Sequence, residues 1–256
     1  MTGSAGLNAV PLTGMPHFAP GMSVADEIVA ALVRDGLVLA DGDVVVVAQK
    51  IVSKSEGRLR DPAAVVPGAE ALRIAAETGR EPELVELILA ESSELLRTHP
   101  AAIVARHRTG HVLANAGIDA SNVEDGQVLL WPEDPDASAR AIREKIEGLT
   151  GLRPAVIIAD SMGRAWRIGT VGTAIGCAGI GPVDDQRGRT DLFGRVLQAT
   201  LIAVADSIAA MAALAMGEGA EGTPAALVRG AGWWVTADHG PGAVAGLRPV
   251  DQDMFR

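Results

Sequence analysis

Two short apolar runs decide the fold of this chain: Val-Val-Val-Val-Ala at residues 44–48 and Pro-Ala-Val-Ile-Ile-Ala at residues 154–159. An unbroken apolar run of this length is typical of a strand covered on both faces, because a strand with one face in water alternates apolar and polar residues. Polar residues follow each run directly, from Gln49 after the first and from Asp160 after the second. The two runs therefore predict buried strands that end in polar segments.

Apolar residues at helical spacing predict helices around these strands. Ser23 and Asp26 fit a capping pattern at the start of one helix, and Asp134 begins another. Because predicted strands and helices alternate, the fold class is α/β, or mixed α+β. The predicted helices are 24–33, about 59–96 with a boundary at 79–82, 135–149 and 196–216, and the other predicted strands are 102–105, 112–113, 128–131 and 224–228.

The composition is that of an ordinary globular protein. Of the 256 residues, 48% are apolar and 21% are charged, which excludes a disordered chain. The formal charge is −10, from 22 Lys and Arg against 32 Asp and Glu. This charge argues against a nucleic-acid partner, because phosphate contacts need a basic face. Cys177 is the single cysteine, so an intramolecular disulfide is impossible and a Cys-based zinc site is disfavoured.

No segment predicts a membrane span or a targeting signal. The most hydrophobic stretch, residues 196–216, is interrupted by Gln198 and Asp206, and a charged residue in mid-span is costly in lipid. We interpret this stretch as an Ala-rich helix packed in the protein interior. Residues 1–6 contain no Lys or Arg and no apolar segment, unlike a signal peptide. We therefore expect a cytoplasmic protein with no membrane partner.

Three polar loops are predicted to leave strands, at residues 49–58, 115–122 and 160–167. A fourth polar loop, residues 217–222, follows a helix. In open α/β sheets, ligands bind beyond the carboxyl ends of the strands. We therefore expect the functional residues in these loops.

Acidic and hydroxyl side chains in these loops are candidate metal ligands. Asp119, Asp160 and Glu218 each lie among glycines or small polar residues, and Ser161 adds a hydroxyl beside Asp160. Hard divalent cations such as Mg²⁺ and Mn²⁺ prefer oxygen ligands of this kind. The alternative is structural, because an Asp after a strand is often a turn or helix-cap residue and a Glu between glycines is usually solvated.

Basic residues in the same loops are candidates for binding anions. Lys54, Arg164 and Arg167 can neutralise phosphate or carboxylate oxygens. The alternative for Lys54 is an ordinary surface lysine. For the two arginines it is surface pairing with nearby acidic residues.

Several familiar catalytic and nucleotide-binding motifs are missing from the sequence. It has no G-x-x-x-x-G-K-[ST], and therefore no P-loop, and neither G-x-S-x-G nor H-E-x-x-H. Residues 217–222 match G-x-G-x-x-G, but they follow a predicted helix and precede a predicted strand. This order is the reverse of the dinucleotide-binding context, so the match counts against a Rossmann site.

The four polar segments, taken together, resemble those of the coenzyme F420:L-glutamate ligases, also called F420-0:gamma-glutamyl ligases. The resemblance extends from about residue 10 to about residue 230, in the order of the family. It depends on VVAQKIVSKSEGR at 46–58, NAGIDASNV at 115–123, ADSMGRAWRIG at 159–169 and MGEG at 216–219.

This resemblance implies a ligase that depends on GTP and a divalent metal. It would join L-glutamate to F420-0, a 5-deazaflavin precursor, through an amide bond, and then add gamma-linked glutamates. We expect an acyl-phosphate intermediate and release of GDP and phosphate, because a carboxylate is a poor electrophile at neutral pH. Two Mg²⁺ or Mn²⁺ ions per site are implied, with K⁺ as a candidate further ion.

The resemblance also implies a homodimer and a family-specific mixed α/β fold, neither P-loop nor Rossmann. We expect a single ligase module over residues 1–230, built from two intertwined subdomains with mixed sheets. Their approximate bounds are 1–125 with 196–256, and 126–195. Some relatives carry a nitroreductase-like domain after this module, and we expect none here.

Carried over by motif, the resemblance assigns roles to particular residues. Asp119 and Asp160 match the ligands of one metal ion, and Ser161 and Glu218 match those of a second. Lys54, Asp160 and Arg164 are the candidate catalytic residues. The positions that match nucleotide contacts are Met15, Pro16, His17, Phe18, Gln49, Lys54, Asn122, Met216, Gly217, Glu218, Gly219, Ala220, Glu221, Gly222 and Thr223.

This chain departs from the family pattern at a few of these positions. Ser161 stands where the family usually has Thr, and it keeps the hydroxyl. Gln49 stands where Ser or Thr is frequent, and Met-Pro-His at 15–17 replaces a more apolar form of the motif.

Three other functions stay open on the sequence alone. The nearest is a nucleotide-dependent acid–amine ligase that acts on a different small acid or amino acid. The second is a non-catalytic module that binds GTP and metal and regulates a partner. The third is a flavin- or deazaflavin-dependent oxidoreductase, which no dinucleotide motif supports.

Overall fold

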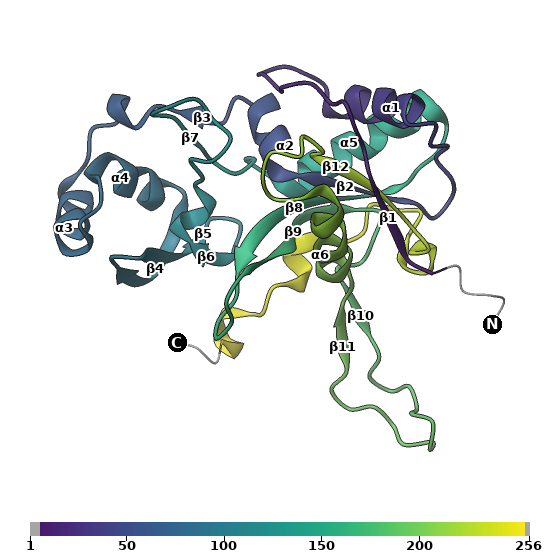
Figure 1. The fold of residues 1–256 in the computed structure, drawn as a ribbon. Helices are drawn as coiled ribbons and strands as arrows, with labels where there is room; N and C mark the ends of the chain where they lie inside the picture. The colour runs from purple at the N-terminus through teal and green to yellow at the C-terminus, as the bar shows by residue number, and fades with distance from the viewer. Residues whose placement is uncertain (1–5, 254–256) are drawn as a thin grey trace.

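The computed structural model describes residues 6–253 of the chain (Figure 1). Residues 1–5, most of the segment considered above for a targeting signal, lie outside this range. The helices are α1 Val24–Arg34, α2 Gln49–Ser55, α3 Ala69–Thr78, α4 Pro82–Ala90, α5 Pro135–Thr150 and α6 Val204–Met216. The strands are β1 Asn8–Pro11, β2 Val44–Ala48, β3 Leu59–Arg60, β4 Ser92–His99, β5 Ala102–His107, β6 Val112–Ala114, β7 Val128–Leu129, β8 Ala155–Gly163, β9 Thr170–Ala178, β10 Val183–Asp185, β11 Leu201–Ala203 and β12 Ala225–Arg229.

The two apolar runs are neighbouring strands of a central five-stranded sheet with the order β1-β12-β2-β8-β9. β2 and β8 pair in parallel, with Val44 opposite Ala155 and Ala48 opposite Ala159, whereas the other pairs of this sheet are antiparallel. The sheet is therefore mixed. This arrangement confirms the predicted α/β class with mixed sheets, which is neither a P-loop nor a Rossmann fold.

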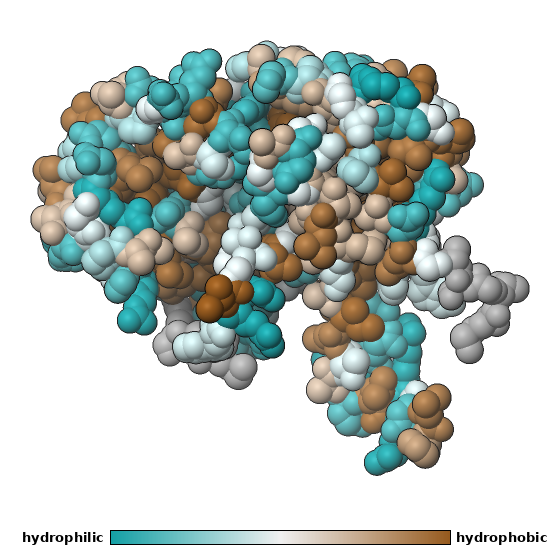
Figure 2. Space-filling view, in the orientation of Figure 1, coloured by the Kyte–Doolittle hydropathy of each residue, from teal (hydrophilic) through white to brown (hydrophobic). Residues whose placement is uncertain are grey.

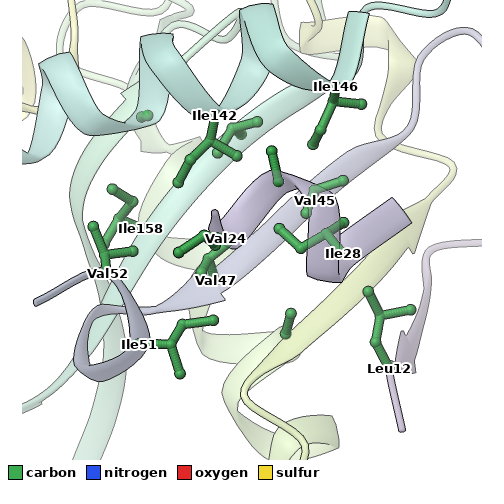
Figure 3. Packing of buried hydrophobic residues seen from close by; sticks show 14 of the residues in the cluster. Leu12, Val24, Ile28, Val45, Val47, Ile51, Val52, Ile142, Ile146 and Ile158 are labelled. Carbon is green, nitrogen blue, oxygen red and sulfur yellow. The ribbon is translucent and has the colours of Figure 1, made fainter. Parts of the chain in front are cut away.

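The four consecutive valines of β2 supply both hydrophobic cores. Val45 and Val47 pack with Ile158 into one core, which α1, α2 and α5 cover (Figure 3). Val44 and Val46 pack into a second core against α6, on the other face of the sheet. Each valine is fully buried, and burial of one such side chain stabilises the fold by roughly 1.5–3 kcal/mol. The prediction of a strand covered on both faces is confirmed.

The predicted helix starts at Ser23 and Asp134 are confirmed. The Ser23 side chain accepts a hydrogen bond from the Asp26 amide, and that of Asp134 accepts one from the Ala137 amide at 2.9 Å. These bonds satisfy amides that have no partner within the first helical turn.

The predicted loop at 49–58 is wrong over most of its length. Residues 49–55 form α2, which begins directly at the end of β2. Its apolar residues Ile51 and Val52 pack into the core beneath the sheet, while Gln49 and Lys50 lie on a cavity. The polar character of this segment therefore reflects the cavity and not a loop in solvent.

The predicted loop at 160–167 is also partly a strand. β8 continues to Gly163 and pairs with β9, a strand that the glycine-rich composition of 167–194 conceals. β9 contains glycines because helices approach it closely. A Cβ at Gly172 would lie 2.5 Å from the Ala209 carbonyl oxygen of α6, and one at Gly176 would lie 2.4 Å from Pro135 of α5.

Two predicted helices have wrong bounds. The helix expected to extend to residue 96 ends at Ala90, and residues 92–99 form β4, which pairs with β5. The helix expected from residue 196 begins at Val204, because residues 201–203 form β11 and pair with β10. In both cases the backbone of the segment pairs with a neighbouring strand, and the sequence pattern alone does not reveal this pairing.

Two features project from this core (Figure 1). A side lobe contains α3, α4, the three-stranded sheet β4-β5-β6 and the ribbon β3-β7, with its own apolar cluster around Ile74, Ile88 and Ile103. The second feature, here called the arm, spans residues 183–203 and contains the ribbon β10-β11. Sheet membership alone does not define folding units, so the predicted subdomain bounds stay a prediction.

Within residues 6–253, no helix has both the length and the apolar character needed to cross a membrane. Of residues 196–216, which we interpret above as an interior helix, only residues 204–216 form a helix. Its buried side chains face the sheet, and Asp206 accepts a hydrogen bond from the Ala174 amide at 3.0 Å.

Candidate functional site

A cavity of about 850 Å³ lies along one edge of the central sheet. The carboxyl ends of β1 and β2, the middle of β8 and the start of the antiparallel β12 all lie at this edge. Every nucleotide-contacting position implied by the family resemblance lines the cavity: Met15, Pro16, His17, Phe18, Gln49, Lys54, Asn122 and the loop from Met216 to Thr223. The structure therefore brings together residues that are far apart in the sequence.

Asp160 forms part of the cavity wall, where β8 passes the end of β2. Its Oδ2 accepts a hydrogen bond of 2.8 Å from the indole Nε1 of Trp131. Burial raises the pKa of Asp160 to about 6, and the negative charge of Asp119 raises it as well, against the effect of the Trp131 hydrogen bond. A carboxylate whose charge is this poorly solvated is stabilised by a nearby cation.

Asp119 does not line the cavity itself but is bound to a residue that does. Lys50 Nζ lies 2.7 Å from Asp119 Oδ2, and the Ser121 amide donates to Asp119 Oδ1 at 2.7 Å. Burial alone would raise the pKa of Asp119, but Lys50 and Ser121 outweigh it and lower that pKa. The Lys50 ammonium thus supplies the positive charge beside Asp119.

Ser161 and Glu218 form the other candidate metal pair. The Ser161 hydroxyl donates to Glu218 Oε1 at 2.5 Å, and both residues line the cavity. Glu218 lies in the loop after α6, so this bond joins that loop to β8. Ser161, Asp160 and Glu218 together present the hydroxyl and carboxylate oxygens that hard divalent cations prefer.

The described part of the chain contains no preassembled group of three or more His, Cys, Asp or Glu side chains that could hold a metal ion. The oxygen donors have other partners: Asp119 pairs with Lys50, Asp160 accepts from Trp131, and Ser161 donates to Glu218. The donor set fits a hard divalent cation, because Asp160 is a desolvated carboxylate on the cavity wall. The four assignments as metal ligands stay predictions.

Gln49 and Lys54, both on α2, present donors to the cavity. Gln49 is almost fully buried, and its Oε1 accepts the Ser53 hydroxyl at 2.7 Å, whereas its Nε2 has no partner among the described residues. A buried donor left unpaired is costly, and Gln49 lines the cavity, so Nε2 is a candidate donor to a ligand there. Lys54 Nζ donates to the Asn122 carbonyl at 2.7 Å, and burial, followed by the charge of Lys50, lowers its pKa.

Arg164 and Arg167 are not brought to the cavity. Both are exposed in the turn 164–169 between β8 and β9, which also carries the exposed Trp166. The assignment of Arg164 as a catalytic residue therefore depends on the family resemblance alone and stays a prediction.

Lys50 and Trp131 are absent from the site residues predicted from the sequence. Lys50 has a signal that points to a site, because it is the second residue after a buried strand. Trp131 has no such signal in the sequence. A Trp in an apolar run predicts core packing, and no sequence pattern shows what its N–H will bind.

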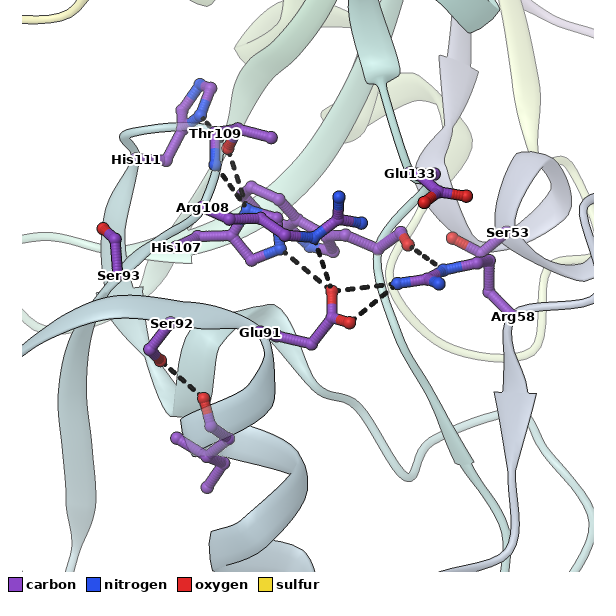
Figure 4. Close-up of polar contacts among 12 residues, drawn as sticks. Ser53, Arg58, Glu91, Ser92, Ser93, His107, Arg108, Thr109, His111 and Glu133 are labelled. Carbon is purple, nitrogen blue, oxygen red and sulfur yellow. Dashed lines mark hydrogen bonds and ion pairs between the residues drawn. The ribbon is translucent and has the colours of Figure 1, made fainter.

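A polar cluster in the side lobe centres on the buried Glu91, just after α4 (Figure 4). It includes His107, whose ring packs against Trp131. Arg58 Nη2 donates to both Glu91 oxygens at 2.9 Å, and Arg108 Nε lies 3.2 Å from Oε2. His107 Nε2 lies 3.3 Å from the same oxygen. Burial alone would raise the pKa of Glu91, but His107 and the two arginines lower it to about 2.

The same cluster reaches the backbone of Trp131. Arg58 Nε donates to the Trp131 carbonyl at 2.8 Å, so Arg58 joins Glu91 to the segment after β7. On the other side, Thr109 Oγ1 lies 2.9 Å from both His107 Nδ1 and His111 Nδ1. Burial and the adjacent His107 lower the pKa of His111 to about 4, so its ring is neutral at pH 7.

The fold and the cavity define a mixed α/β protein without a P-loop or a Rossmann motif, in which carboxylate, hydroxyl and lysine side chains line one cavity. Comparison with known proteins gives the family. The sequence model of the F420-0:gamma-glutamyl ligases matches residues 14–230. The chain belongs to this family, which confirms the resemblance described above.

Relatives from archaea match over most of the chain. The coenzyme F420:L-glutamate ligase of Methanothermobacter thermautotrophicus is 46% identical over 251 residues, covering 98% of this chain and 99% of the relative. Those of Archaeoglobus fulgidus and Methanocaldococcus jannaschii are 47% and 43% identical over 220 and 218 residues. These two alignments cover 86% and 85% of this chain, and 86% of each relative.

The Glu91 cluster predicts a stability that depends on pH. Glu91→Gln should lower the free energy of unfolding at pH 7 by about 3 kcal/mol, because it leaves the largely buried Arg58 and the buried His107 without their anionic partner. The low pKa of Glu91 stabilises the fold above about pH 4.5, and this contribution is lost as the pH falls toward 2. The difference between wild type and variant in urea unfolding should therefore shrink from pH 6 to pH 3.

Glu70→Gln is the matched control, because Glu70 pairs with Arg73 on the exposed surface of α3. It should change the unfolding free energy little at any pH. A Glu91→Gln variant as stable as wild type at pH 7 would contradict the role given to this cluster.

Proposed function

We propose that this protein is a GTP-dependent ligase that joins L-glutamate to F420-0 through an amide bond and then adds gamma-linked glutamates. The observation that carries the proposal is the convergence of every position matched to nucleotide contacts on one cavity. The names of the relatives support the two substrates. The donors on the cavity wall, above all Gln49 Nε2 and Lys54, suit the oxygens of a triphosphate nucleotide.

The chemistry requires activation of an acid. In the first step, a carboxylate oxygen of F420-0 attacks the γ-phosphorus of GTP, the bond from this phosphorus to the bridging oxygen breaks, and GDP leaves. In the second step, the uncharged glutamate amine attacks the acyl carbon, inorganic phosphate leaves, and the amine loses a proton. The product is an amide, and one GTP is consumed for each glutamate added.

Residues of the cavity wall would stabilise the charge that this reaction moves. Asp119 with Asp160, and Ser161 with Glu218, are the proposed ligands of two Mg²⁺ or Mn²⁺ ions. When bound, such ions neutralise phosphate oxygens in the transition state. Lys54, and Lys50 once released from Asp119, add positive charge to the same wall. K⁺ stays a candidate further ion.

Arg164 and Arg167 are proposed to hold an anionic group of a substrate outside the cavity. Their turn follows Asp160 and Ser161 along β8, so a long substrate that extends from the cavity along this strand would reach it. At about 3.3 Å per residue, four residues of strand span about 13 Å.

The first test is a mass-resolved assay of F420-0, L-glutamate and GTP with Mn²⁺. Wild type should give products heavier by one or more glutamyl units, with one phosphate released for each. Asp160→Asn should reduce the rate by 100-fold or more while leaving the fold intact, because it removes a charged oxygen ligand. Asp41→Asn, an exposed residue at the opposite end of β2, is the control and should leave the rate unchanged.

The same assay separates the other functions. Phosphate release with a different acid or amino acid, and none with F420-0 and L-glutamate, would identify a ligase of different specificity. Binding of GTP without turnover for any acid–amine pair would identify a non-catalytic module. A wild-type rate for Asp160→Asn would overturn the metal assignment.

Lys54 provides a second test. Lys54→Met should weaken GTP binding about tenfold or more, because a charge-assisted hydrogen bond to a phosphate is lost. Isothermal titration calorimetry with GDP and with GTP measures this change. Lys145→Met is the control, since Lys145 is paired with Asp26 on the surface of α5. Equal nucleotide affinity in the two variants would remove Lys54 from the site.

We also propose that the protein is a homodimer assembled through the arm. Leu192, Phe193, Val196 and Leu201 of the arm are each more than half exposed (Figure 2). Apolar side chains gathered on a projecting ribbon are typical of a surface that another chain covers. A second copy suits this surface because the family resemblance implies a homodimer.

The arm gives a third test. Phe193→Asp combined with Leu192→Asp should convert the dimer to a monomer, because both charges would be buried in the interface. Light scattering coupled to size-exclusion chromatography measures the mass. Val66→Asp, at an 88% exposed residue of the side lobe, should leave the mass unchanged. A dimer that survives both arm substitutions would contradict this interface.

A further inference from the structure

We propose that Trp131 is a positioning residue that orients the Asp160 carboxylate for cation binding. The indole would hold one carboxylate oxygen and leave the other for the ion. This inference rests on the proposed function, in which Asp160 is a metal ligand. It goes further by assigning a role to a residue of the side-lobe boundary that lies outside the cavity lining.

The contact between Trp131 and Asp160 is a direct hydrogen bond in which the indole is the donor and the carboxylate is the acceptor. Trp131 Nε1 lies 2.8 Å from Asp160 Oδ2, a distance typical of a strong hydrogen bond to a charged acceptor. An indole N–H is a donor only and does not ionise at ordinary pH. It therefore holds a carboxylate oxygen without competing for the metal and without providing a base.

The indole ring is itself held from several sides. Trp131 is fully buried, with the His107 ring 4.9 Å from its own at 52° and the His111 ring 5.5 Å away, edge-on at 80°. On a further side the backbone of Gly117 touches it. A Cβ at Gly117 would lie 2.5 Å from Nε1, so this position accommodates only glycine.

The Glu91 cluster also holds the backbone of Trp131 in place. The Trp131 carbonyl accepts Arg58 Nε, and Arg58 is held in turn by Glu91. His107, which packs on the indole, contacts the same carboxylate. A residue whose ring and backbone are both held can orient a partner precisely. Removal of a hydrogen bond of this kind to a metal ligand changes the affinity for the metal.

The test is direct measurement of Mn²⁺ binding in the presence of GDP, by the electron paramagnetic resonance signal of free Mn²⁺. Trp131→Phe keeps a buried aromatic ring and removes the N–H. It should weaken Mn²⁺ binding at least tenfold, the size expected when such an outer hydrogen bond is lost. In steady-state assays it should lower kcat and raise the Mn²⁺ concentration needed for half-maximal rate, while KM for F420-0 stays at the wild-type value.

One control and one alternative variant make the result specific. Trp234→Phe removes an indole N–H that donates to Asp184 at 3.3 Å, away from the cavity lining, and it should bind Mn²⁺ like wild type. If Trp131→Phe fails to fold, benzothienylalanine at position 131 keeps the bicyclic shape and replaces the N–H with sulfur, and the same weakening is expected.

Asp160→Asn distinguishes failure of this inference from failure of the proposed function. Loss of Mn²⁺ binding in Asp160→Asn together with wild-type binding in both position-131 variants would reduce Trp131 to a packing residue. Wild-type Mn²⁺ binding in Asp160→Asn would overturn the metal assignment itself, and the inference with it.

Discussion

The parallel pairing of β2 with β8 is the constraint on which the rest of the structure depends. It sets Ala48 opposite Ala159, and the residues that follow each partner are Gln49 with Lys50 and Asp160 with Ser161. Gln49, Lys50, Asp160 and Ser161 of the cavity wall take their places from this register. Parallel pairing requires a long connection between the strands, and here that connection includes the whole side lobe and α5.

Electrostatics resolve the apparent conflict between an acidic chain and the anionic substrates proposed for it. The chain as a whole carries a formal charge of −10. At the cavity, Lys50 and Lys54 stand beside the carboxylates, and the desolvated Asp160 favours a cation as neighbour. Local charge, and not the average charge of the surface, decides what such a site can bind.

The sequence predicts best where one physical requirement acts alone. Residues 44–48 and 154–159 are buried on both sides, so their composition needs no context to be interpreted. It predicts poorly where two requirements compete. Residues 49–55 are polar because they face a cavity, and Gly172 and Gly176 stand in β9 because helices approach it, so that both segments look like loops.

The candidate site could be predicted only as separate polar segments. Convergence of Asp119, Asp160 and Glu218 on one region came from the family resemblance, because no spacing rule joins residues so far apart. Trp131 could not be found at all from the sequence, since its contribution is one hydrogen bond from a side chain that otherwise packs like any core aromatic.

The run of identical valines in β2 has a consequence for how the strand is aligned. A shift by one residue would present the same side chain to each core, so burial hardly distinguishes the correct alignment from its neighbour. The ends of the strand must supply the distinction. At one end the Asp43 side chain is buried and paired with Arg229; at the other, the side chains of Gln49 and Lys50 line the cavity. A one-step slip would move Lys50 by about 3.3 Å and exchange inward for outward side chains. The alignment of β2, and with it the position of the cavity wall, is therefore set by polar side chains at the two ends of the strand. The apolar middle of the strand does not set it.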